Sequence, residues 1–350
     1  MTGRITNMKA LCALMVVAIH VKTAAPVGSL MWYVNCFLNE GLCRVAVPFF
    51  FVASGYFLAR HFSEVGWWSR ELGKRVKSLL VPFLVFNCLA MIVVVCCDSM
   101  EVVFHSVFTF LGKAGIRPDM MPALSNLWYL RALFIIVLIS PLLAWMARQR
   151  ECVVLASMLL LAVCVAAFVP FPGCGMCRYS AELRYFFPLE GVLYFMVGVC
   201  LRLRLFCGIF DKLKEYLVAK AFLAGGVAIV VGALLLWVRV MFVLTGHRHP
   251  AGLAGFAAIP FAMYGVFAMC PRKTVWPRIA TLSFPVFLLH RFFVWWFSGS
   301  TSGCPQVDSL SSSVWWYVVR VILAASCSVV VALAAKKIFP RFSAVCFGGR

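Results

Sequence analysis

The sequence predicts an all-α, polytopic integral membrane protein of about ten transmembrane helices, with both termini in the cytoplasm. Of its 350 residues, 64% are hydrophobic and 13% are charged, whereas a soluble domain is about half apolar and about a quarter charged. Apolar runs long enough to cross the hydrocarbon core, about 17 residues or more, recur from end to end. None alternates polar and apolar residues as a β-barrel strand does, so the spanning elements are expected to be helices.

Ten apolar segments make up the predicted bundle. They cover residues 9–26, 43–59, 79–97, 126–146, 152–169, 186–201, 219–238, 252–270, 281–297 and 314–335. The first segment follows Arg4 and Lys9 as in a signal peptide. Since it lacks a small-residue cleavage site and further segments follow, it is interpreted as a retained helix. The longest loop, 98–125, is too short for a soluble domain, so residues 1–350 are predicted to form a single transmembrane domain.

Basic residues decide the predicted orientation. With the N-terminus inside, Lys and Arg in the inner loops outnumber those in the outer loops about three to one, as cytoplasmic loops require. A net charge of +20 would suggest a nucleic-acid partner in a soluble protein. Here the basic residues gather in short loops, so topology and contact with membrane lipids explain the charge, and no nucleic-acid partner is predicted.

Prolines, glycines and cysteines inside the apolar segments have a packing interpretation. Pro48, Gly55, Pro141 and Pro285 are expected at kinks or close helix contacts, which neighbouring helices make tolerable in a bilayer. Most of the sixteen cysteines lie in apolar runs and act as small hydrophobes.

Two cysteines stand apart from the others. Cys174 and Cys177 fall in a predicted outer loop, where a local disulfide would form if that compartment is oxidising. Because no His or carboxylate spacing completes a ligand set, no metal is predicted.

Lys9 and His20 are the most informative pair of polar residues. Eleven helical steps of about 100° bring both to one face, about 16 Å apart at about 1.5 Å per residue. Coenzyme A would suit such a pair, because its phosphates would meet the lysine and its thioester the histidine, which could act as a general base. The alternative is a lysine that snorkels to the membrane surface and a histidine bonded between helices.

The spacing of Lys9 and His20 resembles the basic-x10-His motif of the acyltransferase 3 family of membrane acyltransferases. The stretch that begins at Arg44 and ends in Ser54-Gly-Tyr is similar to the aromatic-rich second helix of that family. Further similarity lies in the basic loop Lys74-Arg75-Val-Lys-Ser-Leu-Leu-Val-Pro82, in Leu127-Trp-Tyr-Leu-Arg131 and in Leu282-Ser-Phe-Pro-Val-Phe-Leu-Leu-His290. The resemblance spans nearly the whole chain.

Two positions depart from the family pattern. Pro48 stands where many members carry Asp, and together with Arg44 it resembles a subgroup associated with acylation of surface polysaccharides. Ser78 replaces the second arginine of a cytoplasmic Arg-x-x-Arg motif. Arg75 and the neighbouring Lys74 then remain as the phosphate contacts that the resemblance implies.

The resemblance implies transfer of an acyl group, usually acetyl from cytoplasmic acetyl-CoA, to a saccharide hydroxyl at the outer face of a bacterial inner membrane. His20 would then be the catalytic residue, as base or acyl relay, and Lys9, Lys74 and Arg75 would hold the donor. Arg44, Ser54 and Glu190 are the candidates for acceptor binding. Arg44 and Glu190 could equally pair with each other, and Arg131 and His290 could serve interhelical packing.

A transporter or flippase is the alternative class for a protein with many helices and buried charges. No inverted repeat is visible in the sequence to support it. Such a protein would move its cargo unmodified, and consumption of acyl-CoA separates the two classes.

Overall fold

The chain is described by a computed structural model in which helices account for all regular structure of the described residues. These are residues 2–21, 25–39, 41–97, 111, 113–114, 121–167, 188–205, 221–298 and 313–347. The α-helices there are α1 (Thr2–His20), α2 (Leu30–Val34), α3 (Ala46–Leu58), α4 (Trp67–Arg75), α5 (Val81–Cys97), α8 (Trp128–Leu138), α9 (Ser140–Met146), α10 (Glu151–Ala167), α12 (Leu189–Leu203), α14 (Ala221–Leu244), α15 (Arg248–Met269), α16 (Pro277–Ser298), α17 (Val314–Ile338) and α18 (Pro340–Cys346).

Short helices of other types join these elements. The π-helical turns are η1 (Asn35–Asn39) and η4 (Val76–Leu80), and the 3-10 turns are η2 (Leu42–Val45), η3 (Ala59–His61) and η5 (Ser125–Leu127). The π-turns connect α2 to the residues before α3 and α4 to α5. A π-turn inside or beside an α-helix shifts the helical register and is frequent at functional sites.

The helices fall on all ten predicted apolar segments, which confirms a multi-pass helical membrane protein. Among the described residues, six helical stretches are long and apolar enough to cross a membrane. They are Leu30–His61, Trp67–Cys96, Phe222–Leu244, Pro250–Met269, Pro277–Ser298 and Val314–Ile338, with Ser125–Leu138 and Ser140–Met146 as a seventh if that bent pair forms one span. The count of ten spans and the cytoplasmic termini remain predictions.

Two of these stretches begin well before the apolar segments predicted for them. The segment 43–59 lies in a helical stretch that starts at Leu30, and the segment 79–97 lies in one that starts at Trp67. The reason is that polar and amphipathic residues such as those of α4 continue a helix while interrupting its hydropathy.

Pro141 produces the kink that the sequence predicts. Helices α8 and α9 meet at an angle of 57°, and Pro141 lies in the first turn of α9, where its missing N–H is tolerated. The Ser140 hydroxyl donates a 2.6 Å hydrogen bond to the carbonyl of Val137, which satisfies a group exposed by the break. Pro285 instead lies inside an uninterrupted α16.

The chain divides into two compact units, each assembled from segments that are distant in sequence. Unit 1 comprises Met1–Met8, Val45–Gly73 and Ile135–Val275, and unit 2 comprises Lys9–Arg44, Lys74–Phe134 and Trp276–Arg350. The single domain expected over residues 1–350 remains a prediction.

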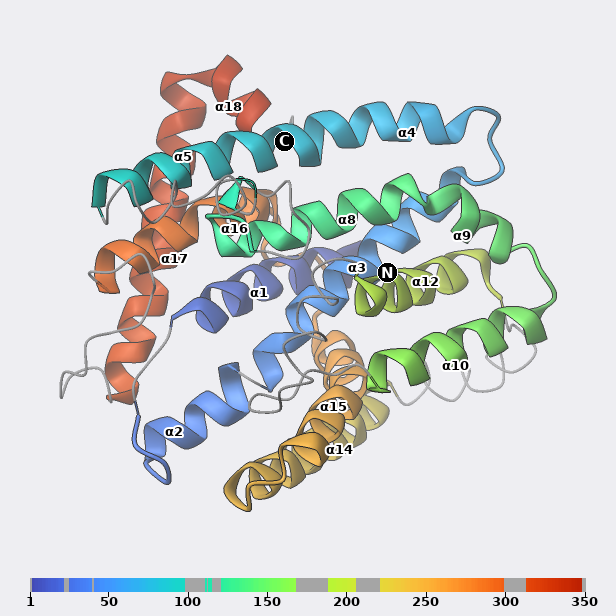
Figure 1. Ribbon diagram of the computed structural model, residues 1–350, viewed down its shortest axis with the longest axis horizontal. Coiled ribbons are helices and arrows are strands. Elements are labelled where there is room, and N and C mark those ends of the chain that lie inside the picture. Colours follow the sequence, from blue (N-terminus) through green and yellow to red (C-terminus); the bar gives the residue numbers. More distant parts are fainter. Residues whose placement is uncertain are drawn as a thin grey trace. The chain divides into compact units, whose positions relative to one another are not determined.

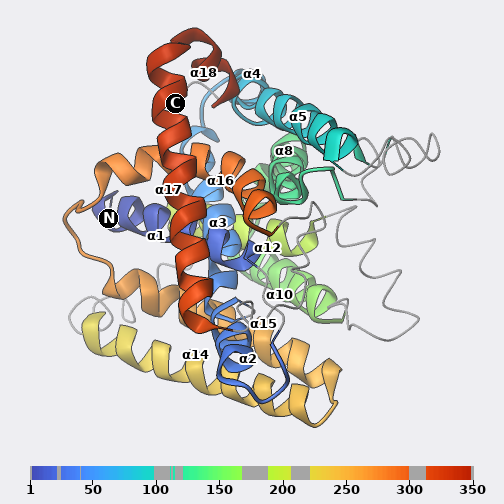
Figure 2. The same cartoon turned by 90° about the vertical axis from the view of Figure 1, so that its left-hand side faces the viewer.

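Unit 1 is organised around two pairs of packed helices. Helix α3 packs against α12, and α14 lies beside α15 (Figures 1 and 2). At the first crossing, a Cβ added to Gly55 would overlap the carbonyl of Phe195, and one added to Gly198 would overlap the carbonyl of Val52. Gly55 is therefore a close helix contact, as predicted, because only a hydrogen fits between the backbones.

Asn7 ties the start of α1 to the segment that follows α15 in unit 1. Its Nδ2 donates to the carbonyls of Pro271 at 3.0 Å and Lys273 at 2.9 Å, and its Oδ1 accepts from the amide of Val275 at 2.9 Å. The side chain is fully buried. A buried amide with its donors and acceptor satisfied stabilises one defined geometry.

In unit 2, α16 packs against α17, and α18 packs against α5 (Figures 1 and 2). The Phe86 ring of α5 stacks on Phe347 at a centroid distance of 6.2 Å and also approaches Phe292 of α16 at 6.5 Å. These aromatic contacts place α5, α16 and the end of the chain around a common apolar interior.

The glycine contact between α3 and α12 yields a stability prediction. Gly198→Ala is expected to lower the free energy of unfolding by about 1–3 kcal/mol, since the new methyl group overlaps the Val52 carbonyl and overpacking costs about this much. The apparent melting temperature of detergent-solubilised protein measures the effect. Gly226→Ala in α14, where a Cβ meets no atom within 4 Å, is the matched control and should not lower it. Equal melting of Gly198→Ala and wild type would contradict the assigned contact.

Candidate functional site

Lys9 and His20 lie on one uninterrupted helix. Because α1 is α-helical from Thr2 to His20, the face shared by the two side chains, expected from their spacing, is confirmed. Both side chains are half-buried, and both residues belong to unit 2. His20 is the last residue of the helix, so its imidazole stands where the α1 backbone ends.

The predicted donor-binding residues Lys74 and Arg75 also belong to unit 2. They end α4 and directly precede the π-turn η4. Lys74 is exposed, whereas Arg75 is half-buried with its Nε out of contact with solvent. Two cations of different exposure at one helix end can present charge to phosphates, and Arg75 adds a planar group with several donors.

Two adjacent residues of helix α16 contact His20 at the end of α1. The His290 ring lies 5.2 Å from the His20 ring, centroid to centroid, and the ring planes are tilted by 40°. Arg291 donates a long 3.4 Å hydrogen bond from Nη1 to the carbonyl of His20. The Arg291 guanidinium lies 5.8 Å from the ring centroid of Trp295, one turn further along α16. Backbone and side chain of His20 are thus both faced by the same helix.

His290 is completely buried and has one defined hydrogen bond. Its Nδ1 lies 3.0 Å from the carbonyl oxygen of Val286. Since a carbonyl only accepts, Nδ1 carries the proton, and in the neutral ring Nε2 keeps a lone pair. Within the described part of the chain, no hydrogen-bond partner reaches Nε2. An orphaned acceptor of this kind is costly in an apolar interior, by about 1–3 kcal/mol.

A second polar group fixes the chain that follows α1. The Tyr317 hydroxyl of α17 donates to Asn39 Oδ1 and lies 3.4 Å from the carbonyl oxygen of Ala18, and Asn39 Nδ2 donates to Asn35 Oδ1 at 2.8 Å. Tyr317 and Asn39 are buried. The π-turn η1 is thereby connected to α17 next to the last turn of α1.

Asn126 connects the segment before α8 to α16. Its Nδ2 donates a 2.6 Å hydrogen bond to the carbonyl of Phe287, and the side chain is buried with Oδ1 unpartnered. Asn126 immediately precedes the Leu127 to Arg131 stretch that the sequence singled out. Tyr129 in that stretch contacts the Phe287 ring edge-on at 5.8 Å. The stretch therefore lies against the helix that carries His290.

Arg44 lies in a short 3-10 helix near the start of the predicted segment 43–59. Arg44 is exposed and belongs to the 3-10 turn η2, whereas the helix that was expected to contain it begins only at Ala46. The amide of Arg44 bonds the carbonyl of Gly41, so a tight turn replaces the first helical turn. Arg44 belongs to unit 2 with His20, and its contact with an acceptor remains a prediction.

Ser54 and Glu190 belong to unit 1. Ser54 lies in α3 and Glu190 in the first turn of α12, and both are half-buried. A carboxylate in the first turn of a helix is stabilised by the helix dipole, which gives Glu190 a local role. The proposed pairing of Glu190 with Arg44 and the acceptor role of Ser54 remain predictions.

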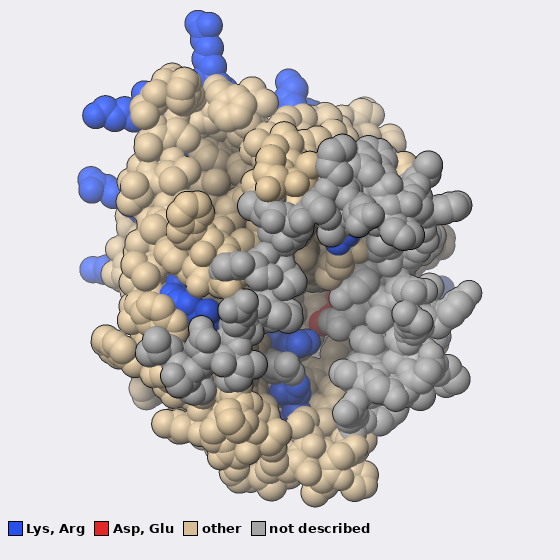
Figure 3. Space-filling view, turned by 60° about the vertical axis from the view of Figure 1, so that its left-hand side comes forward, with Lys and Arg blue, Asp and Glu red and all other residues tan. Residues whose placement is uncertain are grey.

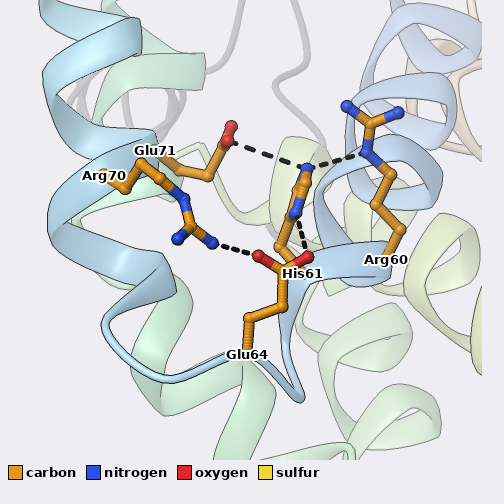
Figure 4. A network of polar contacts seen from close by, with 5 residues as sticks. All are labelled: Arg60, His61, Glu64, Arg70 and Glu71. Atoms are coloured by element: carbon orange, nitrogen blue, oxygen red, sulfur yellow. Dashed lines mark hydrogen bonds and ion pairs between the residues drawn. The ribbon is translucent and has the colours of Figure 1, made fainter.

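A polar network organises the basic loop between α3 and α4 in unit 1 (Figure 4). His61 Nδ1 lies 2.7 Å from Glu64 and Nε2 lies 3.7 Å from Glu71, while Arg60 Nε approaches His61 Nε2 at 2.7 Å and Arg70 pairs with Glu64. Glu71 is buried. Arg60 and Arg70 thus act in the local structure, Arg60 through a hydrogen bond to His61 and Arg70 through an exposed ion pair with Glu64 that is individually weak.

The surface drawn in Figure 3 is built mainly of uncharged residues, with Lys and Arg at scattered positions and little acidic surface. Such a surface is expected where lipid is the surrounding medium. Among the described residues, no group of three or more His, Cys, Asp or Glu side chains could hold a metal ion. Cys174 and Cys177 lie outside the described residues.

Comparison with known proteins identifies the class. A family model described as an acyltransferase domain, acyltransferase 3, matches residues 3–333. The chain belongs to this acyltransferase family. It is also similar to the succinoglycan biosynthesis protein ExoH of Rhizobium meliloti (strain 1021), with 27% identity over 144 residues. That match covers 39% of this chain and 38% of ExoH, well under two thirds of the relative's length. No solved structure matches the chain.

Sequence reasoning found His20 but assigned no site role to the polar residues around it. His290 and Arg291 come from α16, Tyr317 comes from α17, and Asn39 and Asn126 come from short turns. The usable signal was a polar or ionisable residue within an apolar segment. Such a residue is costly to place in a membrane, but its position in the sequence does not indicate which other helix it faces.

The bond between Tyr317 and Asn39 yields a second stability prediction. Tyr317→Phe is expected to cost about 1–3 kcal/mol, because it leaves a buried amide oxygen without its donor. Apparent melting temperatures of Tyr317→Phe, Asn39→Ala and the double variant form a cycle with an expected coupling of about 1 kcal/mol. Tyr33→Phe, which removes a half-buried hydroxyl elsewhere in unit 2, is the control. Additive losses in the cycle would show that the two side chains act independently.

Proposed function

We propose that the protein is a membrane-embedded acyltransferase that moves an acyl group, in the first instance acetyl, from cytoplasmic acyl-CoA to a hydroxyl of a cell-surface or lipid-linked saccharide. The observation that carries the proposal is the pair Lys9 and His20 on one face of α1 in a chain of the acyltransferase family. The name of ExoH, a succinoglycan biosynthesis protein, supports a polysaccharide acceptor.

The donor end of the proposed site is cationic. Lys9 lies about three helical turns before His20 on α1. An elongated ligand along the helix would therefore meet a cation at one end and His20 about 16 Å away at the other. Lys74 and Arg75 of the same unit supply further charge for the phosphates of coenzyme A. Arg75 suits this role because its donors can bond a phosphate in a bidentate manner.

The transfer step uses His20. In one form, an imidazole nitrogen takes the proton of the acceptor hydroxyl, the oxygen attacks the thioester carbonyl, and the coenzyme A thiolate leaves and takes up a proton. In the other form, His20 itself carries the acyl group between donor and acceptor. Both need a neutral imidazole with an available lone pair. The half-buried position of His20 allows a substrate to reach it.

The proposed setting is a bacterial inner membrane with both chain ends in the cytoplasm. This orientation places the Lys9 end of α1 toward the cytoplasmic donor and the His20 end toward the outer half of the membrane. The acceptor would then approach from the outside. Arg44, Ser54 and Glu190 are the candidates to bind it, and Arg44 is the one of these that shares a compact unit with His20.

Binding of acetyl-CoA tests the donor end. In nanodiscs, Lys9→Ala and Arg75→Ala are each expected to weaken acetyl-CoA binding by about 3- to 10-fold or more through lost charge-assisted bonds, whereas His20→Ala should bind like wild type. Lys337→Ala removes an exposed cation near the end of α17 and controls for net charge. Absence of saturable binding to folded wild type would favour a transporter over an acyltransferase.

Acyl transfer tests the histidine. Membranes that contain the protein and its saccharide should consume radiolabelled acetyl-CoA and retain the label, and His20→Ala should reduce the rate by about 100-fold or more, as expected for loss of a general base. Membrane insertion of the variant is checked in parallel. Full activity of inserted His20→Ala would remove His20 from the mechanism.

A further inference from the structure

We propose that His290 is a positioning residue for His20: its Nε2 accepts a hydrogen bond from the imidazole N–H of His20 and so leaves the other nitrogen of His20 as the reacting lone pair. This inference rests on the proposed acyl transfer for its catalytic consequence. The hydrogen bond itself concerns only the two side chains. It assigns a function to a buried histidine that sequence reasoning attributed to packing.

The first support is the orphaned nitrogen of His290. The ring is fully buried, its Nδ1–H donates to the Val286 carbonyl, and Nε2 has no partner among the described residues. Buried polar atoms without partners are rare, and each one needs a physical explanation. Because Nε2 is the acceptor nitrogen of this tautomer, the missing group has to be an N–H or O–H donor.

The second support is the distance to His20. Two imidazoles joined by an N–H···N bond of about 2.9 Å have centroids about 5 Å apart, and the rings of His20 and His290 lie 5.2 Å apart. The two ring planes are tilted by 40° relative to each other. Rotation of the His20 ring about χ2, a broad torsion for histidine, would direct its N–H at Nε2.

The third support is the neighbouring residue of α16. Arg291 holds the carbonyl of His20 by its Nη1, at 3.4 Å. One helix therefore restrains the backbone of His20 and presents an acceptor to its side chain. Asn126 in turn bonds the carbonyl of Phe287, one turn before His290, which fixes the α16 segment that carries both residues.

The chemical consequence follows from the two nitrogens of an imidazole. A hydrogen bond from one N–H to an acceptor raises the basicity of the other nitrogen and sets its direction. During transfer, the proton of the saccharide hydroxyl would move to that nitrogen of His20. The resulting imidazolium would still donate to His290 Nε2, so the acceptor stabilises the charged form, as a third group does in catalytic triads.

The test uses two substitutions of similar size but different chemistry. His290→Leu removes the acceptor, and His290→Gln keeps an amide oxygen near the place of Nε2. The first measurement is the rate at which diethyl pyrocarbonate modifies His20, followed by peptide mass spectrometry in nanodiscs. We expect modification of His20 to slow about threefold or more in His290→Leu, because a less basic nitrogen is a weaker nucleophile, and to recover in His290→Gln.

The second measurement is the kinetics of acetyl-CoA consumption. His290→Leu should lower kcat by about 100-fold or more while the KM for acetyl-CoA stays within about twofold, and His290→Gln should recover at least about a tenth of the wild-type kcat. A packing role would instead make both variants lose melting temperature together without a difference in His20 reactivity. Equal modification rates of His20 in wild type, His290→Leu and His290→Gln would overturn the proposal.

The two measurements separate this proposal from the proposed function. If wild type consumes no acetyl-CoA, acyl transfer fails as the function, while the modification rates still decide whether His290 bonds His20. If wild type is active and the modification rates are equal, His20 can remain the base and only the role of His290 is lost.

Discussion

Polar groups inside apolar surroundings have no water to bond, so each one that the chain carries into its helices needs a partner from the protein. This constraint explains why the polar side chains of unit 2 are connected rather than scattered. Tyr317 meets Asn39, Asn126 meets the backbone of α16, and Arg291 meets the end of α1. Each bond joins segments far apart in the sequence. The hydrogen bonds that satisfy these polar groups therefore also hold the tertiary structure together.

The same constraint concentrates polarity at one place, the C-terminal end of α1. The Ala18 carbonyl accepts from the Val21 amide and has the Tyr317 hydroxyl of α17 3.4 Å away, while the His20 carbonyl accepts from Arg291 of α16. Helix ends leave carbonyls unsatisfied, and here the carbonyl of the last residue, His20, accepts from a guanidinium. His20 is thus held at an end of a helix rather than within one, where a substrate can reach its ring.

Family membership and geometry contribute different parts of the functional picture. The match over residues 3–333 assigns the chain to the acyltransferases, and the partial similarity to ExoH directs attention to polysaccharide. Neither says which side chains cooperate. The geometry adds His290 and Arg291 beside His20, and it separates the candidate residues into those that share a compact unit with His20 and those, Ser54 and Glu190, that belong to the other unit.

The sequence by itself determined the helical membrane class, the break at Pro141, the close contact at Gly55 and the shared face of Lys9 and His20. All of these depend on local properties, namely hydropathy, backbone restriction and helical period. Only the tertiary structure decided that His290, Arg291 and Tyr317 face the end of α1, and that Arg44 lies in a turn outside α3. Those facts depend on which helices pack together. The sequence of an apolar helix has no periodic pattern that identifies the helix against which it packs.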